Sequence, residues 1–158
     1  MFRGIFLNTV DAKGRTSMPA RFREILTETY GDERFFMTNS GPVELGSGIF
    51  ARGLSIYPYQ EWFALEEKVV KGAGFTFAQL NSITRLILAP GVECSADRQG
   101  RVLIPPHLRS AAALEREIVF VGSQKKIEIW SQAEWERVTG QAEKDFPANT
   151  QALAELGL

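Results

Sequence analysis

The sequence predicts an α+β fold, mainly β, in which two tandem copies of one unit share a core with approximate internal twofold symmetry. Two observations support this prediction: residues 11–23 recur at an offset of 86, and a second block recurs at an offset of 73. Self-similarity of this kind indicates repeated structural units. A unit of about 60 residues is marginally stable alone, so the copies are expected to close their strands into one barrel without exposed edges.

The first repeated block predicts a turn between two strands. It aligns residues 11–23 with residues 97–109 without gaps, and the residues at five positions are identical. The matching pairs are Asp11 and Asp97, Gly14 and Gly100, Arg15 and Arg101, Pro19 and Pro105, and Arg23 and Arg109. Because aspartate can bond its own backbone and glycine can adopt a positive φ, residues 11–14 and 97–100 are expected to be turns. Each turn is expected to join a hairpin, with strands at 5–10 and 15–18 in the first copy and at 92–96 and 101–104 in the second.

The remaining elements are expected in the same order in both copies. Short helices are expected after Pro19 and Pro105, and longer helices after Pro58 and Ser131. Strands are expected at residues 35–38, 54–57, 118–121 and 126–130. The connection before residues 54–57 is longer than its counterpart, which accounts for the change of offset. A linking helix carries an apolar stripe through Phe77, Leu80, Ile83 and Ile87. The tail from residue 145 could dock on a neighbouring subunit or be mobile, and we expect it to be mobile.

These elements divide the chain into four segments. Residues 5–57 are predicted to form the first unit, and residues 58–89 a helical linker. Residues 90–133 are predicted to form the second unit, and residues 134–158 a C-terminal helix and tail. Because each unit is small, we expect the two units to interlock and not to fold as separate domains.

Composition argues against an enzyme, a metal centre and a membrane protein. The chain has 158 residues, and its single cysteine and single histidine provide neither an internal disulfide nor the ligands of a structural zinc site. Cys94 is expected to be a small buried hydrophobic residue, and His107 a solvent-facing one. No phosphate-binding glycine motif occurs, so no cofactor is predicted. With charges throughout the first twenty residues and no long apolar run, the expected location is cytoplasmic.

Positive charge is concentrated in the repeated blocks. The net charge of the whole chain is −1, but residues 1–23 carry +4 and residues 92–109 carry +1, which leaves −6 for the remainder. A chain with this total is no general polycation. The distribution therefore favours local binding of a polyanion by the first block more strongly than by the second.

Three features of the sequence resemble the MraZ family of bacterial transcriptional regulators. They are the opening residues 1–4, the doubled Asp-x-x-Gly-Arg turns followed by proline and arginine, and the closing residues 126–130. The resemblance extends from residue 1 to about residue 140. Residues 39–53 form a longer, glycine-rich connection than this family leads us to expect, and the linking helix carries Arg85 alone where several basic residues are expected.

The resemblance implies a fold, a partner and a location. The fold would be a double-split β-barrel of two tandem units like those of the AbrB and SpoVT swapped-hairpin proteins. The partner would be double-stranded DNA, bound at direct repeats upstream of division and cell-wall genes by a ring-shaped homo-oligomer that represses its own operon. Such a protein would be associated with the nucleoid.

The resemblance also assigns residues to DNA binding. The Asp-x-x-x-Arg element of the family falls on Asp11 and Arg15, and again on Asp97 and Arg101, with the arginines contacting DNA. The chemistry of the side chains agrees, because an arginine on a two-stranded ribbon can bond guanine or phosphate in the major groove. Lys13 and Arg98 lie in the turns and suit phosphate contacts.

Alternatives remain open for the roles of these arginines and for the function of the protein. Each arginine could instead pair with the aspartate of its own turn, an interaction worth about 0 to 1 kcal/mol on a surface. For Arg101, DNA binding and this structural role are about equally expected, and Arg101 could also serve a subunit interface. Arg21, Arg23 and Arg109 follow the turns and could be structural. The alternative function is a non-enzymatic oligomeric assembly protein that sequesters a partner without binding DNA.

Overall fold

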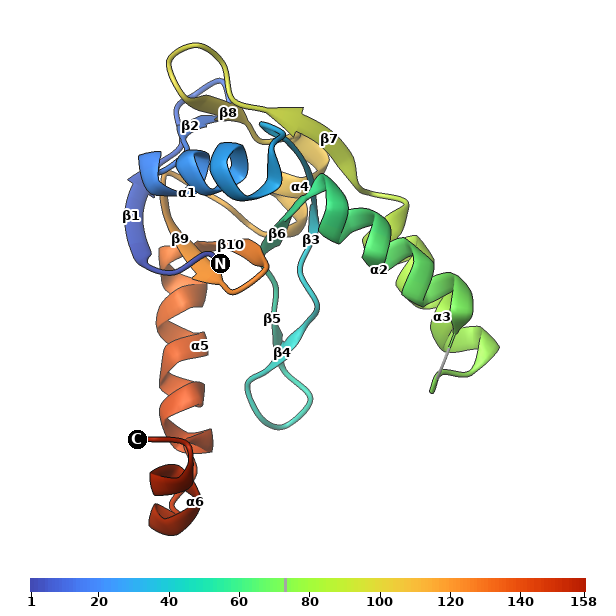
Figure 1. The fold of residues 1–158 in the computed structure, drawn as a ribbon, viewed down its shortest axis with the longest axis vertical. Coiled ribbons are helices and arrows are strands. Elements are labelled where there is room, and N and C mark those ends of the chain that lie inside the picture. The colour runs from blue at the N-terminus through green and yellow to red at the C-terminus, as the bar shows by residue number, and fades with distance from the viewer. Residues whose placement is uncertain (73) are drawn as a thin grey trace.

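The described residues form an α+β fold, with ten strands and with helices at its periphery (Figure 1). The computed structural model describes residues 1–72 and 74–158; Ala73, in the predicted linker, lies outside the described residues. The first copy contains β1 (Ile5–Thr9), β2 (Arg15–Ser17), α1 (Ala20–Ile25), the π-helix η1 (Leu26–Tyr30), β3 (Arg34–Asn39), β4 (Val43–Glu44), β5 (Phe50–Ala51), β6 (Leu54–Pro58) and α2 (Tyr59–Lys71). Then follow α3 (Phe77–Ile83), the π-helix η2 (Thr84–Leu88), β7 (Val92–Ser95), β8 (Arg101–Leu103), α4 (Pro106–Ala111), β9 (Glu117–Ser123), β10 (Lys126–Ser131), α5 (Gln132–Asp145) and α6 (Thr150–Glu155). The predicted order of strands and helices is thus confirmed in both copies.

The two copies interlock in a six-stranded antiparallel sheet. Its strand order is β1-β9-β10-β6-β3-β7, so an edge strand of each copy pairs with the other copy. The strands β2 and β8 form a separate two-stranded sheet, and β4 and β5 form another. These ladders do not join into one closed barrel, so the predicted barrel is not confirmed by the strand pairing of the described residues.

An approximate twofold axis relates the copies, as the repeat predicts. In the β2–β8 pair, Thr16 lies opposite Val102, which is its own counterpart at the offset of 86. In the β6–β10 pair, Ser55 lies opposite Glu128, its counterpart at the offset of 73. Because equivalent residues face each other in both antiparallel pairs, the axis passes through the two pairs.

The predicted hairpins are wrong, although their turns are present. Strand β1 pairs with β9 and not with β2, while β2 pairs with β8 of the other copy. The pattern of alternating residues identified the strands but could not identify partners that are distant in sequence. Pairing between copies buries Thr16 and Val102 in one shared core, which neither small unit could complete alone.

Several large aromatic residues of the strands and helices lie in the interior of the chain. The side chains of Phe35, Trp62 and Trp130 are almost fully buried within the chain. Trp62 also stacks on Phe36, with ring centroids 4.8 Å apart. These residues therefore stabilise the fold of the single chain, since each buried ring removes a large apolar area from water.

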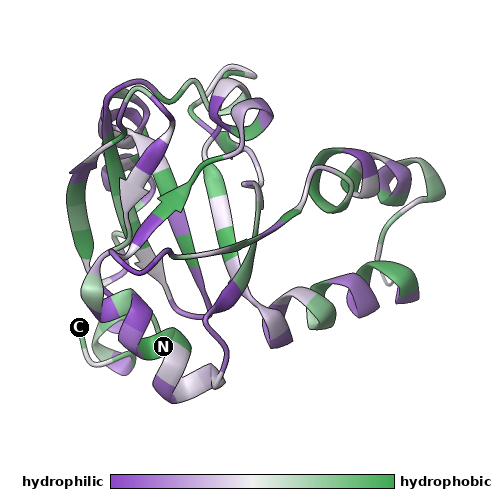
Figure 2. Ribbon diagram, turned by 90° about the horizontal axis from the view of Figure 1, so that it is seen from above, coloured by the Kyte–Doolittle hydropathy of each residue, from purple (hydrophilic) through white to green (hydrophobic). Residues whose placement is uncertain are grey.

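The helices extend away from the sheet in two directions. Helices α2 and α3 both project from the body on the same side, and Figure 2 shows apolar residues along both. Helices α5 and α6 project from another side (Figure 1), and the tail contains a short helix capped by Asn149. The β4–β5 pair fills the longer connection of the first copy. No helix of the described residues is long and apolar enough to cross a membrane.

Candidate nucleic-acid interface

The turn at residues 11–14 is built around the carboxylate of Asp11. Its Oδ1 atom accepts hydrogen bonds from the backbone nitrogens of Lys13 and Arg15, both at 2.9 Å. Its Oδ2 atom accepts a hydrogen bond from Nε of Arg15 at 2.8 Å. Gly14 completes the turn with a φ of +84°, a conformation that residues with a Cβ adopt only with strain.

The second copy repeats this turn with the same bonds. The Oδ1 atom of Asp97 accepts from the backbone nitrogens of Gln99 and Arg101, at 2.8 and 2.9 Å. Its Oδ2 atom accepts from Nε of Arg101 at 3.0 Å, and Gly100 has a φ of +77°. In both copies the aspartate accepts the backbone bonds of the turn and the glycine supplies the positive φ that the turn requires.

The hydrogen bonds of the turns shift the titration of both aspartates. The bond from the backbone nitrogen of Arg15 is the main cause that lowers the pKa of the Asp11 carboxyl. Desolvation opposes this change, and the Arg15 side chain adds to it. The same causes, with Arg101 as donor, lower the pKa of Asp97. Both carboxylates therefore stay ionised at neutral pH and keep their arginines in place.

Each turn is also packed against an arginine from the other copy. The guanidinium of Arg109, on α4, occupies the space that a Cβ at Gly14 would need. The Arg23 guanidinium occupies the equivalent space at Gly100, where a Cβ would lie 2.7 Å from Cζ. The structure thus gives Arg23 and Arg109 structural contacts, one of the two roles the sequence left open for them.

The β2–β8 pair forms a two-stranded ribbon with one buried and one exposed face. Thr16 and Val102 point into the core, while Ser17 and Leu103 are exposed. In the register of the pair, Arg15 lies opposite Leu103, and Arg101 lies opposite Ser17. The ribbon therefore presents two arginines at diagonal corners, one from each copy. Local sequence patterns do not identify Ser17 and Leu103 as ribbon residues, because their place on this face depends on strand pairing between the copies.

The arginines of the ribbon are held by their turns but not buried. The side chains of Arg15 and Arg101 are 32% and 35% exposed. Among the described residues, each is bonded to its aspartate through Nε, and no hydrogen bond engages its two terminal nitrogens. A guanidinium has five N–H donors, so most of its donors remain available to a ligand.

Lys13 and Arg98 are exposed in the turns, and both turns lie at the end of the molecule opposite α6 (Figure 1).

Other candidate chemistry is limited in the described part of the chain. No three residues among its histidine, cysteine, aspartate and glutamate side chains are placed to hold a metal ion. Burial raises the pKa of the Cys94 thiol to about 11, so this group is protonated at neutral pH. His107 is exposed, with Nε2 lying 3.1 Å from the carbonyl oxygen of Pro90.

The fold and the site define a class of protein: a chain of two tandem strand, turn, strand and helix units that interlock through a shared, arginine-bearing ribbon. Over 100% of both chains, this chain is 63% identical to "Transcriptional regulator MraZ" of Geobacter metallireducens and 60% identical to that of Geotalea uraniireducens. The protein of the same name from Desulfitobacterium hafniense is 38% identical, again over 100% of both chains. A family model described as "MraZ protein, putative antitoxin-like" matches residues 87–156. The chain belongs to the MraZ family, which confirms the resemblance seen in its sequence.

Proposed function

We propose that this protein is a sequence-specific, DNA-binding transcriptional regulator that represses its own division and cell-wall operon. The names of its relatives support a role in transcription. The observation that carries the proposal is the exposed ribbon, on which Arg15 and Arg101 share one face. As a member of this family, the chain would act in the cytoplasm at the nucleoid and would need no cofactor.

The ribbon suits the major groove of double-stranded DNA. A two-stranded ribbon fits this groove, and an arginine can make two parallel hydrogen bonds to O6 and N7 of guanine. Arg15 would read bases in this way, while Lys13 would bond phosphate and fix the position of the ribbon. In the second copy, Arg101 offers the same guanidinium as Arg15, and Arg98 offers a guanidinium for phosphate. The interlocked units would constitute the double-split barrel of the swapped-hairpin proteins.

Binding to direct repeats would require an oligomer. Non-specific contacts to phosphate give dissociation constants of roughly 10⁻⁴ to 10⁻⁶ M at physiological salt, which is weak for one chain. Several subunits in a ring would each place a ribbon on one repeat and raise the effective concentration of the others. Exposed apolar side chains on and next to the projecting α2 and α3 offer material for subunit contacts: Phe63, Val70, Phe75 and Phe77.

A fluorescence anisotropy titration tests the proposal. The purified protein is titrated into labelled DNA from the region upstream of its own gene, and into a scrambled duplex of equal length, at several salt concentrations. We expect tighter binding to the upstream DNA, with an affinity that falls steeply as salt increases because phosphate contacts release counterions. Equal and salt-independent affinity for both duplexes would contradict the proposal.

The second candidate is an oligomeric assembly protein that binds no DNA. The observation in its favour is the pairing of Arg15 with Asp11 and of Arg101 with Asp97, which places a negative charge beside each arginine. On this alternative, the ribbon would contact protein only. The same titration distinguishes the two, because an assembly protein of this kind would show no preference for the upstream DNA.

A further inference from the structure

The approximate symmetry of the chain creates two equivalent clefts beside the two turns. The first cleft, of about 990 Å³, lies between the turn at Asp11 and helix α4, and its wall includes Arg109 and Arg116. The second cleft, of about 560 Å³, lies between the turn at Asp97 and helix α1. Each cleft is therefore formed by the turn of one copy and the helix of the other.

Strand register identifies the equivalent positions in the two clefts. Thr9 pairs with Glu117 in β1–β9, and Ser95, the counterpart of Thr9, pairs with Arg34 in β3–β7. Glu117 and Arg34 are therefore equivalent positions. The residues that precede them, Arg116 in the first cleft and Glu33 in the second, are equivalent as well. Both residues line their clefts and both are exposed.

The two clefts differ in net charge because equivalent positions carry different residues, as at Arg116 and Glu33. The charged residues that line the first cleft are Asp11, Arg109, Glu115 and Arg116, which sum to zero. Those that line the second cleft are Arg23, Glu24, Glu28, Glu33, Asp97 and Arg98, which sum to −2. The net charge of the second cleft therefore repels an anion, whereas the first cleft has no net charge, although the two share the same backbone arrangement.

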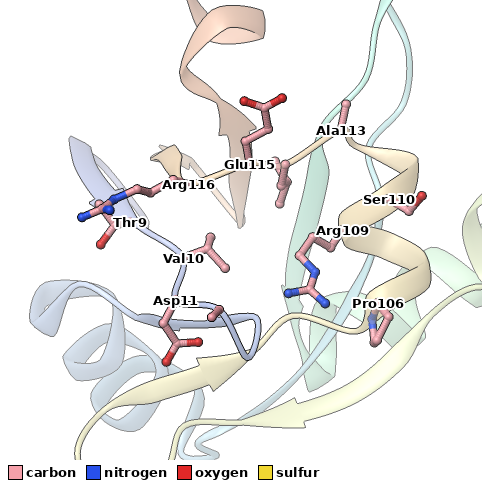
Figure 3. A pocket seen from close by; sticks show the side chains of 11 residues that line it. Thr9, Val10, Asp11, Pro106, Arg109, Ser110, Ala113, Glu115 and Arg116 are labelled. Atoms are coloured by element: carbon pink, nitrogen blue, oxygen red, sulfur yellow. The ribbon is translucent and has the colours of Figure 1, made fainter.

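The arginines of the first cleft have no carboxylate partner among the described residues. Asp11 is bonded to Arg15, and no ion pair within 4.0 Å involves Arg109 or Arg116. The backbone carbonyl of Arg116 accepts a hydrogen bond from Val10 N at 2.8 Å, which fixes Arg116 next to the residue that precedes Asp11. Figure 3 shows the Arg109 side chain pointing toward the turn and the Arg116 side chain on the Thr9 side of the pocket.

We propose that the first cleft binds phosphate groups of the DNA backbone, with Arg109 and Arg116 each contacting phosphate from its own side of the pocket, and that the second cleft does not. Guanidinium groups bind phosphate oxygens through charge-assisted hydrogen bonds, often two at a time. The bound phosphate fixes the DNA beside the first turn, where Arg15 and Lys13 lie. Each chain then faces DNA with its first turn, and the acidic second cleft keeps the second turn away. This inference rests on the proposed function and selects between the two turns.

The test compares Arg116→Ala with Glu33→Ala, which change equivalent positions. Both variants are titrated into the upstream and the scrambled duplex between about 50 and 200 mM salt. Arg116→Ala is expected to weaken binding about tenfold on both duplexes, because a phosphate contact carries no sequence information. The slope of log affinity against log salt should decrease by about 0.9 for each lost phosphate contact. Glu33→Ala is expected to stay within about twofold of the unchanged protein.

Two further measurements keep the outcomes distinct. Arg137→Ala removes the same charge from α5, at the far end from the turns, and corrects for the effect of net charge (Figure 1). Circular dichroism and light scattering confirm that each variant keeps its fold and assembly. An unchanged salt slope in Arg116→Ala, or an equal loss in Arg98→Ala, would overturn the inference while leaving the proposed function in place. Failure of the unchanged protein to prefer upstream DNA would instead overturn the proposed function.

Discussion

The guanidinium of Arg109 lies against Gly14, so a helix of the second copy supports the turn of the first. The reciprocal contact joins Arg23 to Gly100. The carbonyl oxygens of the two glycines accept hydrogen bonds at 2.9 Å from Ile104 N and Met18 N, each in the other copy. The position of each turn, and of the arginine that follows it, therefore depends on both copies at once.

Gly14→Ala is predicted to weaken DNA binding through displacement of Arg109. The new Cβ requires the guanidinium to move, and the positive φ adds strain of about 1 to 2 kcal/mol to the folded state. Gly46→Ala is the matched control, because Gly46 has a φ of +91° and no atom within 4 Å of an added Cβ. Urea denaturation should show a similar loss of unfolding free energy for both variants. Only Gly14→Ala should lose affinity in the anisotropy titration; an equal loss from Gly46→Ala would refute the role of this contact.

The two aspartates of the turns are predicted to titrate below the ordinary aspartate pKa of about 3.9. The hydrogen bonds that lower the pKa values of Asp11 and Asp97 exist only in the folded chain. The stability they contribute is therefore fully present above the unfolded pKa, and it is lost as pH falls through the folded values. Carboxyl chemical shifts measured by NMR against pH would report both groups. Midpoints at or above 3.9 would contradict the turn geometry.

Cys94 is predicted to react slowly with thiol reagents in the folded protein. Its pKa of about 11 leaves a thiolate fraction at pH 8 that is about a hundredfold below that of a free cysteine. The rate with a chromogenic disulfide should be lower by at least this factor, and it should recover in urea. A native rate equal to the rate in urea would show that the thiol is neither buried nor perturbed.

The sequence predicted the elements of this fold better than their partners. The repeat identified both turns, because aspartate and glycine at fixed spacing have a local conformational role. Local patterns could not show that β2 pairs with β8, since that register depends on a core shared by both copies. For the same reason the ribbon residues Ser17 and Leu103 were missed. The repeat itself is the sequence feature that could reveal this pairing, because equivalent strands related by a twofold axis can pair antiparallel.

The sequence predicts candidate site residues, but it does not predict the ion pairs and charges that surround them. Sequence alone placed Arg15 and Arg101 after their turns, and it left open whether they project freely or pair with aspartate. The structure shows the ion pairs, because Nε of each arginine is in reach of the Oδ2 atom of its own turn. The clefts could not be predicted, since Arg116 and Glu33 lie outside the repeated block and meet the turns only through strand pairing.

The most direct test of the account is the affinity of Arg15→Ala for the upstream DNA, measured by anisotropy together with light scattering. Arg15→Lys keeps the charge but loses the two parallel hydrogen bonds to guanine, and Arg137→Ala removes the same charge from α5. The account predicts a large loss of affinity in Arg15→Ala, a loss of preference for the upstream sequence in Arg15→Lys, and little change in Arg137→Ala, with the assembly intact in all three. Unchanged binding by Arg15→Ala would contradict the account.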